Sequence, residues 1–249
     1  MGRVTLLGIE VDPLTIAELN DVVRDAVAQG ARRIVAHHNA HSVYLFNRDA
    51  KVRAFYARAY CIHVDGMALV FLGRLLGRPL GREHRVTYVD WVGPLMTLAN
   101  RSGHRVFYLG SAPAVAERDA ARLRREHPGL EIATHHGYFH DAAGEGSASV
   151  LQQIREFRPD ILLVGMGMPR QEHWVFDHLD NIDARVILTA GACMDYVAGA
   201  VPTPPRWMGR WGLEWLYRLA GDPRRLWRRY LVEPWFVLRL FLRDLVTRR

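Results

Sequence analysis

The alternation of short apolar runs with amphipathic segments is the feature that most constrains how this chain folds. Four segments between the runs have the periodicity of helices, and in the first of them Thr15 and Glu18 are spaced for a capping box. Strands that alternate with helices form mostly parallel sheets with helices on both faces, so the sequence predicts an α/β fold. The strands are expected at Val4–Ile9, Ile34–His37, Cys61–Val64, Arg105–Leu109, Glu131–Thr134, Asp160–Val164 and Arg185–Thr189, and the helices at Thr15–Gln29, Ala114–His127, Ala148–Phe157 and Arg170–Leu179.

The charge of the chain is concentrated in its last fifth. The formal net charge is +7, yet residues 1–202 carry equal numbers of basic and acidic residues, whereas residues 203–249 carry 11 arginines against four acidic residues. Such asymmetry indicates an acidic partner surface. We therefore expect a neutral α/β body over residues 1–202 and a basic, amphipathic helical appendage over residues 203–249 that meets the acidic partner. The same stretch holds five of the seven tryptophans: Trp207, Trp211, Trp215, Trp227 and Trp235.

Several classes of protein are disfavoured by composition. Cys61 and Cys193 lie far apart and form no CxxC motif, which argues against a disulfide scaffold and a structural zinc site. The N-terminus has no signal-peptide pattern, and no stretch of 18 uncharged apolar residues predicts a membrane-spanning helix. Any membrane contact is therefore expected to be peripheral.

Two predicted strand ends carry groups suited to acid–base chemistry. His37, His38 and Asn39 follow one strand, and Asp65 follows the next. A carboxylate at such an end could remove a proton from an acceptor hydroxyl, although Asp65 could equally cap the following helix. The three imidazoles of His37, His38 and His41 could act as a base, bind a metal or pack in the interior. We favour a fourth interpretation, in which residues 37–41 form a polar loop that binds a donor sugar.

Two other strand ends are suited to binding a phosphorylated donor. Gly110 and Ser111 lead from a strand into a helix N-terminus, where backbone N–H groups favour a phosphate. Gly167 precedes the first turn of another helix, where Gln171 and Glu172 are expected to face the cleft. The sequence has no DxD motif for a divalent metal, so arginines or helix dipoles would have to neutralise a leaving diphosphate. We expect no metal and no cofactor.

At these positions the sequence resembles the WecG/TagA/CpsF glycosyltransferases, also called glycosyltransferase family 26. The resemblance implies a Rossmann-like body with a helical appendage that engages the membrane, and metal-independent, inverting transfer from a UDP-sugar, often UDP-N-acetylmannosamine. The acceptor would be a sugar on undecaprenyl diphosphate, at the cytoplasmic face of the bacterial inner membrane. The motifs that carry it are Asn39, Asp65-Gly66, Arg85 with Asp90, Gly110, Gly137-Tyr138-Phe139, Gly167-x-Pro169-x-Gln171-Glu172, Ala198-Gly199 and Gly212-Leu213-Glu214-Trp215-x-x-Arg218-Leu219.

Roles for individual residues follow from the resemblance. It implies that Asp65 is the general base and that Arg218, Arg225 and Arg228 contact the acceptor diphosphate. The donor side would comprise Asn39, Arg85, Asp90, Gly110, Ser111, Gly137, Tyr138, Gly167, Gln171 and Glu172.

Three positions depart from the family pattern. His37 stands where the family usually has threonine, Tyr88 stands where it commonly has glycine, and residues 203–205 replace an Arg-Ala-Pro segment. We therefore extend the expected donor sugar to a hexose or an N-acetylhexosamine, and keep His37 and His38 as candidates to share the base role with Asp65.

Two other functions are weighed against a transferase. A nucleotide-dependent oxidoreductase would need a glycine-rich dinucleotide fingerprint, but the Gly110 turn lacks the second and third glycines. A nucleic-acid-binding module would use the basic, Trp-rich tail, but that tail also carries many aliphatic residues, which suit lipid or protein better. The expected partners are a nucleotide-sugar donor, a lipid-linked acceptor and an anionic membrane, with no nucleic acid. The sequence is compatible with a homo-oligomer.

Overall fold

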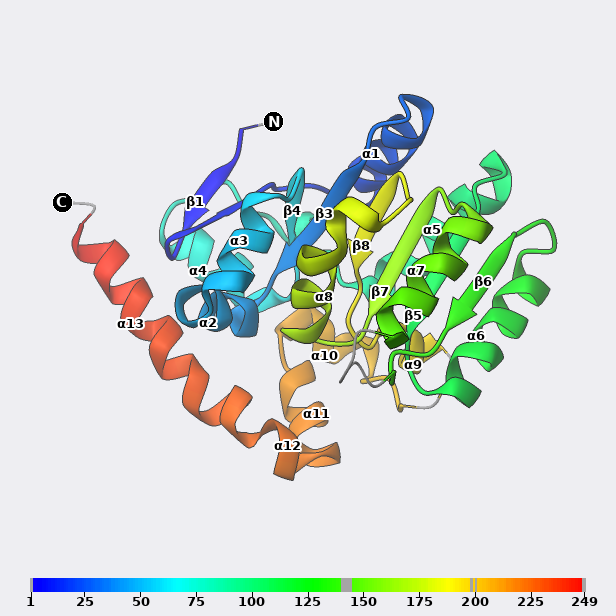
Figure 1. Ribbon diagram of the computed structural model, residues 1–249. Coiled ribbons are helices and arrows are strands. Elements are labelled where there is room, and N and C mark those ends of the chain that lie inside the picture. The colour runs from blue at the N-terminus through cyan, green and yellow to red at the C-terminus, as the bar shows by residue number, and fades with distance from the viewer. Residues whose placement is uncertain (1, 140–144, 198, 200, 248–249) are drawn as a thin grey trace.

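The fold is built on one parallel sheet, which the computed structural model in Figure 1 shows at the centre of the molecule. The structure describes residues 2–139, 145–197, 199 and 201–247. The strand order is β4-β3-β8-β7-β5-β6, and every neighbouring pair is parallel. This confirms the predicted α/β class. The strands are β3 (Arg33–His38), β4 (Cys61–Val64), β5 (Val106–Gly110), β6 (Ile132–His135), β7 (Ile161–Gly165) and β8 (Val186–Thr189).

Helices cover both faces of the sheet because alternate residues of each strand point to opposite sides. In β7, Ile161 and Leu163 join the apolar cluster on one face, whereas Leu162 and Val164 join the cluster on the other. The first face is covered by α1 (Ile16–Ala28), α5 (Tyr88–Ser102), α6 (Pro113–Glu126) and α9 (Cys193–Val197). The second is covered by α3 (Ala50–Ala57), α7 (Glu145–Phe157) and α8 (Arg170–His178), the last followed by the 3-10 turn η2 (Leu179–Asn181).

The N-terminal segment differs from the prediction. We expected one strand over Val4–Ile9, but the chain forms an antiparallel hairpin of β1 (Val4–Leu6) and β2 (Ile9–Val11). Leu7 and Gly8 both have positive φ, of +54° and +76°, which reverses the chain between the strands. The capping box at Thr15 and Glu18 is present at the start of α1, as predicted.

The hairpin is the base of a third apolar cluster, which the C-terminal helices complete. This cluster also contains residues of α2 (Ala40–Arg48) and α4 (Met67–Leu75). From α13 it takes the buried side chains of Val237 and Leu240. The 3-10 turn η1 (Arg82–His84) follows α4. The C-terminal helices follow the last strand and α9, and they are α10 (Arg206–Trp211), α11 (Glu214–Gly221), α12 (Pro223–Trp227), the π-helical turn η3 (Arg228–Val232) and α13 (Glu233–Val246).

Two polar contacts hold α13 against the body. The Leu7 N–H donates to Asp244 Oδ2 over 2.9 Å, and His41 Nδ1 lies 2.6 Å from Glu233 Oε2. Figure 1 shows α13 running beside α2, with α10 to α12 below the lower edge of the sheet. The C-terminal helices therefore pack along one side and the lower edge of the body. No helix among the described residues is long and apolar enough to cross a membrane.

The connections of the sheet define where a ligand is expected. After β5 the chain continues outward to β6, whereas after β7 it continues to β8 on the opposite side. Ligands of open parallel sheets bind outside the carboxyl ends of the strands, where the connections diverge in this way. That position lies between β5 and β7.

Candidate active site

The Asp65 carboxylate lies where β4 ends, close to the end of β3. Asn39 Nδ2 donates to Asp65 Oδ2 over 3.1 Å, and the Asp65 N–H donates to the carbonyl of His38. The N-cap of α4 is Gly66, with φ of +90°, and no side chain caps that helix. Asp65 is therefore not a helix cap, and its side chain remains 23% exposed.

Asn39 is held in place by the helix that it begins. It is the N-cap of α2, and its Oδ1 accepts the Ser42 N–H over 3.0 Å. That bond fixes the amide so that its NH₂ group points at Asp65. Asn39 and Asp65 thus form a preorganised pair across two neighbouring strands.

Only one of the two candidate histidines lies beside this pair. His37 is buried, with Nε2 3.8 Å from Asp65 Oδ2, and burial lowers its pKa against the opposing effect of Asp65. His38 is stacked on Tyr56 at 4.0 Å between ring centroids, and its Nδ1 lies 2.8 Å from Ser42 Oγ. Burial lowers the pKa of His38 well below its usual value. Both imidazoles are therefore neutral at pH 7, and the geometry gives His38 a packing role.

The ring of His37 packs against a cluster of aromatic side chains that the sequence did not predict. Its centroid lies 5.5 Å from that of Tyr88 and 5.6 Å from that of His63, and Trp91 packs against both of these rings. His37 and Tyr88 are two of the positions at which this chain departs from the family pattern. The two rings are in contact, and His37 lies next to Asp65, so both departures alter the same part of the site.

The strands β5 and β7 end in Gly110 and Gly165, and Gly191 lies two residues beyond the end of β8. A Cβ on Gly110 would lie 2.6 Å from the carbonyl oxygen of Gly165, and a Cβ on Gly165 would lie 2.7 Å from that of Gly191. A Cβ on Gly137 would lie 3.1 Å from the Cα of Gly110. The strand ends therefore pack this closely because these residues are glycines, and the Tyr108 hydroxyl lies beside Gly110 and Gly165.

Other predicted donor-side residues lie in the loops that follow β5, β6 and β7. Ser111 is buried with φ of +56°, and its Oγ lies 2.7 Å from Tyr108 Oη. Tyr138 is 68% exposed, and the Arg170 guanidinium lies 5.8 Å from its ring centroid. Gly167 has φ of +79° in the turn between β7 and α8. Of the motif Ala198-Gly199, Ala198 lies outside the described residues.

Gln171 and Glu172 differ from the expectation that they face an open cleft. Both side chains are buried: Gln171 Oε1 accepts the Gly191 N–H over 3.0 Å, and Gln171 Nε2 donates to Glu172 Oε1 over 2.7 Å. Burial raises the pKa of Glu172 to about 7. The Gln171 side chain thus ties the start of α8 to the loop that follows β8, so the two residues have a supporting position in the interior.

Arg85 connects the body to the C-terminal helices. Its guanidinium donates to Asp90 Oδ2 and to Glu214 Oε1, each over 2.9 Å. A Cβ on Gly209 would lie 2.9 Å from Arg85 Nη2, so the glycine leaves the room that the guanidinium occupies. Arg85 and Asp90, expected on the donor side, are thus engaged with each other and with α11.

A cavity of about 680 Å³ separates the body from the C-terminal helices. Asn39 and Asp65 line it from the strand ends, and Arg218 and Arg229 line it from the opposite side. Its remaining polar groups include His41, which pairs with Glu233 outside the lining, and the side chains of this pair are only 15% and 12% exposed. The apolar walls are formed by Ala40, Met67, Ala68, Leu72, Trp215, Leu231, Pro234, Trp235, Val237 and Leu238.

The three arginines expected at an acceptor diphosphate are placed differently from one another. Arg218 lines the cavity beside the Tyr196 ring, and its buried Nε has no hydrogen-bond partner among the described residues. Arg225 is exposed and paired with Asp222, and Arg228 is exposed over Trp227. The structure therefore brings Arg218, but not Arg225 or Arg228, to the cavity that Asp65 lines.

The outer surface of the C-terminal helices is apolar. Trp211 is 64% and Trp235 is 70% exposed, and Leu75 of α4 is 69% exposed. The exposed apolar residues from this part of the chain are Trp207, Trp211, Trp215, Leu216, Tyr217, Trp227, Leu231, Val232, Trp235, Leu238, Leu242, Leu245 and Val246. So many exposed large apolar side chains in one segment indicate a protein or membrane contact.

The described residues contain no group of three or more His, Cys, Asp or Glu side chains that could hold a metal ion. Metal independence stays a prediction.

A parallel sheet with a topological switch point, a carboxylate at a strand end and a cavity lined by arginines are features of an enzyme that acts on an anionic ligand. Comparison with known proteins makes the class specific. The profile of the glycosyl transferase WecG/TagA/CpsF family matches residues 4–249, so the chain belongs to this family of glycosyltransferases.

Curated relatives match nearly the whole chain. The N-acetylglucosaminyldiphosphoundecaprenol N-acetyl-beta-D-mannosaminyltransferases of Staphylococcus aureus strains MRSA252 and NCTC 8325 are 27% identical over 230 residues. The aligned part covers 91% of this chain and 88% of each relative. The predicted family and enzyme class are therefore confirmed, and a transferase replaces the oxidoreductase alternative.

Sequence reasoning missed several residues of the site. Arg229 follows Arg228 directly, but the family resemblance implied Arg228, and the π-helical turn over residues 228–232 was not predicted. Pro234 was the available clue: it has no N–H to donate four residues back, and the Glu233 N–H donates to the Arg228 carbonyl five residues back. The pairing of His41 with Glu233 joins positions far apart in the chain, which single-sequence patterns do not reveal.

Proposed function

We propose that this protein is an inverting, metal-independent glycosyltransferase of cell-envelope or exopolysaccharide synthesis. It transfers a hexose or an N-acetylhexosamine, with N-acetylmannosamine as the leading candidate, from UDP to a sugar on undecaprenyl diphosphate. The observation that carries the proposal is the position of Asp65, which follows the edge strand β4, accepts a hydrogen bond from Asn39 at the end of β3, and lines an arginine-bearing cavity. The names of the relatives support this donor and acceptor class.

The reaction is a single displacement in which Asp65 is the base. The acceptor hydroxyl oxygen attacks the anomeric carbon, its proton passes to the Asp65 carboxylate, and UDP departs with the electron pair of the broken bond. Attack from the face opposite UDP inverts the anomeric centre. The amide of Asn39, held by Ser42, orients the carboxylate towards the incoming hydroxyl.

The departing diphosphate needs positive potential where it lies. The Gly110 turn leads into the N-terminus of α6 at Pro113, and the positive end of the helix dipole there favours the phosphates. Arg218, on the far side of Asp65, supplies charge on the acceptor side of the cavity. This division gives each diphosphate its own positive site without a metal.

The protein acts at the cytoplasmic face of the inner membrane as a peripheral protein. The exposed tryptophans of α10 to α13 suit the headgroup layer, where amphipathic rings are stable. The arginines of the same segment are attracted to anionic lipids, each contributing about 1 kcal/mol. The apolar outer surface therefore supports a membrane over a nucleic acid as the partner of the basic tail.

A donor panel tests the proposal. Purified protein is incubated with single UDP- or GDP-sugars and a prenyl-diphosphate-linked N-acetylglucosamine, and products are identified by mass spectrometry and the anomeric configuration by NMR. We expect transfer from a UDP-hexose or UDP-N-acetylhexosamine with inversion. Absence of transfer from every UDP-sugar, in a protein that binds UDP, would refute it.

A further inference from the structure

We infer that the cavity between the body and the C-terminal helices holds the first isoprenoid units of the acceptor lipid inside the protein, with Arg229 binding its diphosphate together with Arg218. The inference rests on the proposed acceptor class and goes beyond it. It assigns a site to the lipid chain, and it assigns a role to Arg229 in place of Arg228.

The cavity has a polar end and an apolar end. Asn39 and Asp65 lie at the strand ends, whereas Leu72 lies five residues beyond Met67 along α4, which is about 7.5 Å at 1.5 Å per residue. Across from α4, Val237 and Leu238 extend the apolar wall along α13. A ligand that reaches from Asp65 along these helices passes from polar surroundings to aliphatic side chains.

The apolar end is continuous with the outer apolar surface. Trp235 and Leu238 line the cavity and are still 70% and 40% exposed, and Leu231, also a lining residue, is 52% exposed. These side chains belong to both surfaces. A prenyl chain can therefore leave the cavity towards a bilayer without crossing a polar barrier.

The polar end has the charge that a lipid diphosphate requires. Arg218 and Arg229 both line the cavity, and the charge of Arg229 acts on His37, which lies next to Asp65. A diphosphate between these arginines would hold the first sugar near the base. Asp65 and Glu214 also line this end and would repel a diphosphate. The two arginines are therefore needed for the diphosphate to bind there.

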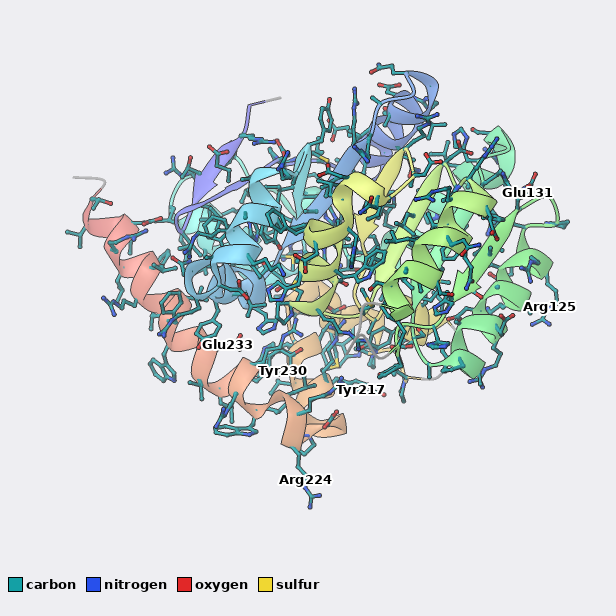
Figure 2. The ribbon with its side chains drawn as sticks, in the orientation of Figure 1. Arg125, Glu131, Tyr217, Arg224, Tyr230 and Glu233 are labelled. Carbon is teal, nitrogen blue, oxygen red and sulfur yellow. The ribbon has the colours of Figure 1, made fainter. Side chains whose placement is uncertain are left out.

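The π-helical turn explains why Arg229 takes this position. Between α12 and α13, residues 228–232 form bonds five residues apart, and Arg229, Tyr230 and Leu231 all line the cavity in succession. Figure 2 shows Tyr230 and Glu233 on the side of these helices that faces the body, and Arg224 extending away from the molecule. Arg224 therefore serves as a control arginine from the same segment.

Calorimetry with farnesyl diphosphate and inorganic diphosphate tests both parts of the inference on the full chain. We expect farnesyl diphosphate to bind more tightly, because each buried CH₂ contributes about fourfold in affinity. Its heat-capacity change should also be the more negative, as burial of apolar surface requires. Equal affinities and equal heat-capacity changes would overturn the assignment of the lipid chain.

Two variants separate the tail from the head group. Ala68→Phe fills the apolar wall at an exposed helical position, and should weaken farnesyl diphosphate at least tenfold while leaving inorganic diphosphate unchanged. Arg229→Gln should weaken both ligands about tenfold or more, since it removes a charge-assisted hydrogen bond. The matched controls are Ala28→Phe, at an exposed position of α1, and Arg224→Gln, and neither should change either affinity.

The outcomes distinguish this inference from the proposed function. Transfer that proceeds while Ala68→Phe and Arg229→Gln bind farnesyl diphosphate like the native chain overturns the inference alone. Loss of binding in these variants, in a protein that transfers no sugar, leaves the lipid site in place and overturns the proposed function.

Discussion

The glycine-lined ends of β5, β7 and β8 and the cavity beneath the C-terminal helices are constructed from different parts of the chain. The first is shaped by backbone, with carbonyl groups so close that a single Cβ does not fit, and by the hydrogen bonds of the buried Gln171 side chain. The second is shaped by side chains from α2, α4, α11, η3 and α13, many of them exposed. Backbone N–H groups suit a nucleotide diphosphate, whereas apolar side chains suit a prenyl chain, so each surface suits the ligand proposed for it.

The two regions also differ in how they are held. The sheet is fixed by continuous parallel pairing, while the C-terminal helices depend on a short apolar contact and on polar links such as Arg85–Glu214, His41–Glu233 and Asp244 with the Leu7 N–H. Changes to the body are therefore expected to act on donor binding and chemistry. Changes to the helices are expected to act on the acceptor and the membrane.

Removal of residues 203–249 should have the largest effect. We expect complete loss of transfer to a lipid-linked acceptor and of sedimentation with anionic liposomes, because Arg218, Arg229 and the exposed tryptophans are removed together. UDP binding, measured by calorimetry, should persist as the control for a folded body. Sedimentation equal to that of the full chain would show that the membrane contact lies elsewhere.

Asp65→Asn should act on chemistry alone. General base catalysis contributes about 10²–10⁴ in rate, so kcat should fall by that factor while UDP-sugar binding is retained. Asp183→Asn, at an exposed position, is the control. A variant that turns over at the native rate would transfer the base role to His37.

Glu172→Gln should change the pH dependence of stability. Burial raises the pKa of Glu172 to about 7, so its protonated form stabilises the fold at low pH, and this contribution is lost as pH rises towards and through 7. Above that pH the buried carboxylate costs about 3 kcal/mol, a cost that the amide variant avoids. Urea unfolding at pH 5 and pH 8 measures this, and parallel curves for the two proteins would contradict it.

Glu214→Gln should loosen the link between the two regions. Arg85 and Glu214 are largely shielded from solvent, so loss of the ion pair should lower the free energy of unfolding by about 1–3 kcal/mol. The exposed pair Arg105–Glu131 is the control, and Glu131→Gln should cost at most about 1 kcal/mol. Equal losses in thermal unfolding would mean that Arg85 does not tie α11 to the body.

Chelation should have the smallest effect. With arginines and a helix N-terminus as the proposed positive groups, activity should be unchanged in EDTA. Loss of activity in EDTA that Mg²⁺ or Mn²⁺ restores would place a metal at the donor diphosphate.

The sheet was largely predictable from sequence because its strands are short β-branched runs with clear periodicity between them. The observed bounds of β4 are those predicted, and those of β5, β6, β7 and β8 differ by about a residue. The hairpin was missed because Leu7 adopts positive φ, which an apolar β-branched context does not suggest. The division at residue 202 stays a prediction, although α13 shares a core with the hairpin.

The site was only partly predictable, for a physical reason. Asn39 and Asp65 were each expected at a strand end, and their contact follows from the pairing of β3 with β4, which the sequence did not predict. The burial of Gln171 and Glu172, the link from Arg85 to Glu214 and the position of Arg229 all depend on contacts between distant segments. Likewise, the contact of His37 with Tyr88 becomes visible only when the two strands and α5 are brought together.

The position of α13 has a consequence for synthesis on the ribosome. N-terminal segments fold first as a chain emerges, so the sheet and its glycine-lined crevice can form before residues 214–244 are available. During that interval the hairpin lacks the partner that Asp244 supplies, and Val43 and Met67 lack the cover of Val237 and Leu240. The nascent chain thus presents an uncovered apolar surface next to Asp65, which makes this the part of the molecule where a chaperone is most needed, and the acceptor side is the last to mature.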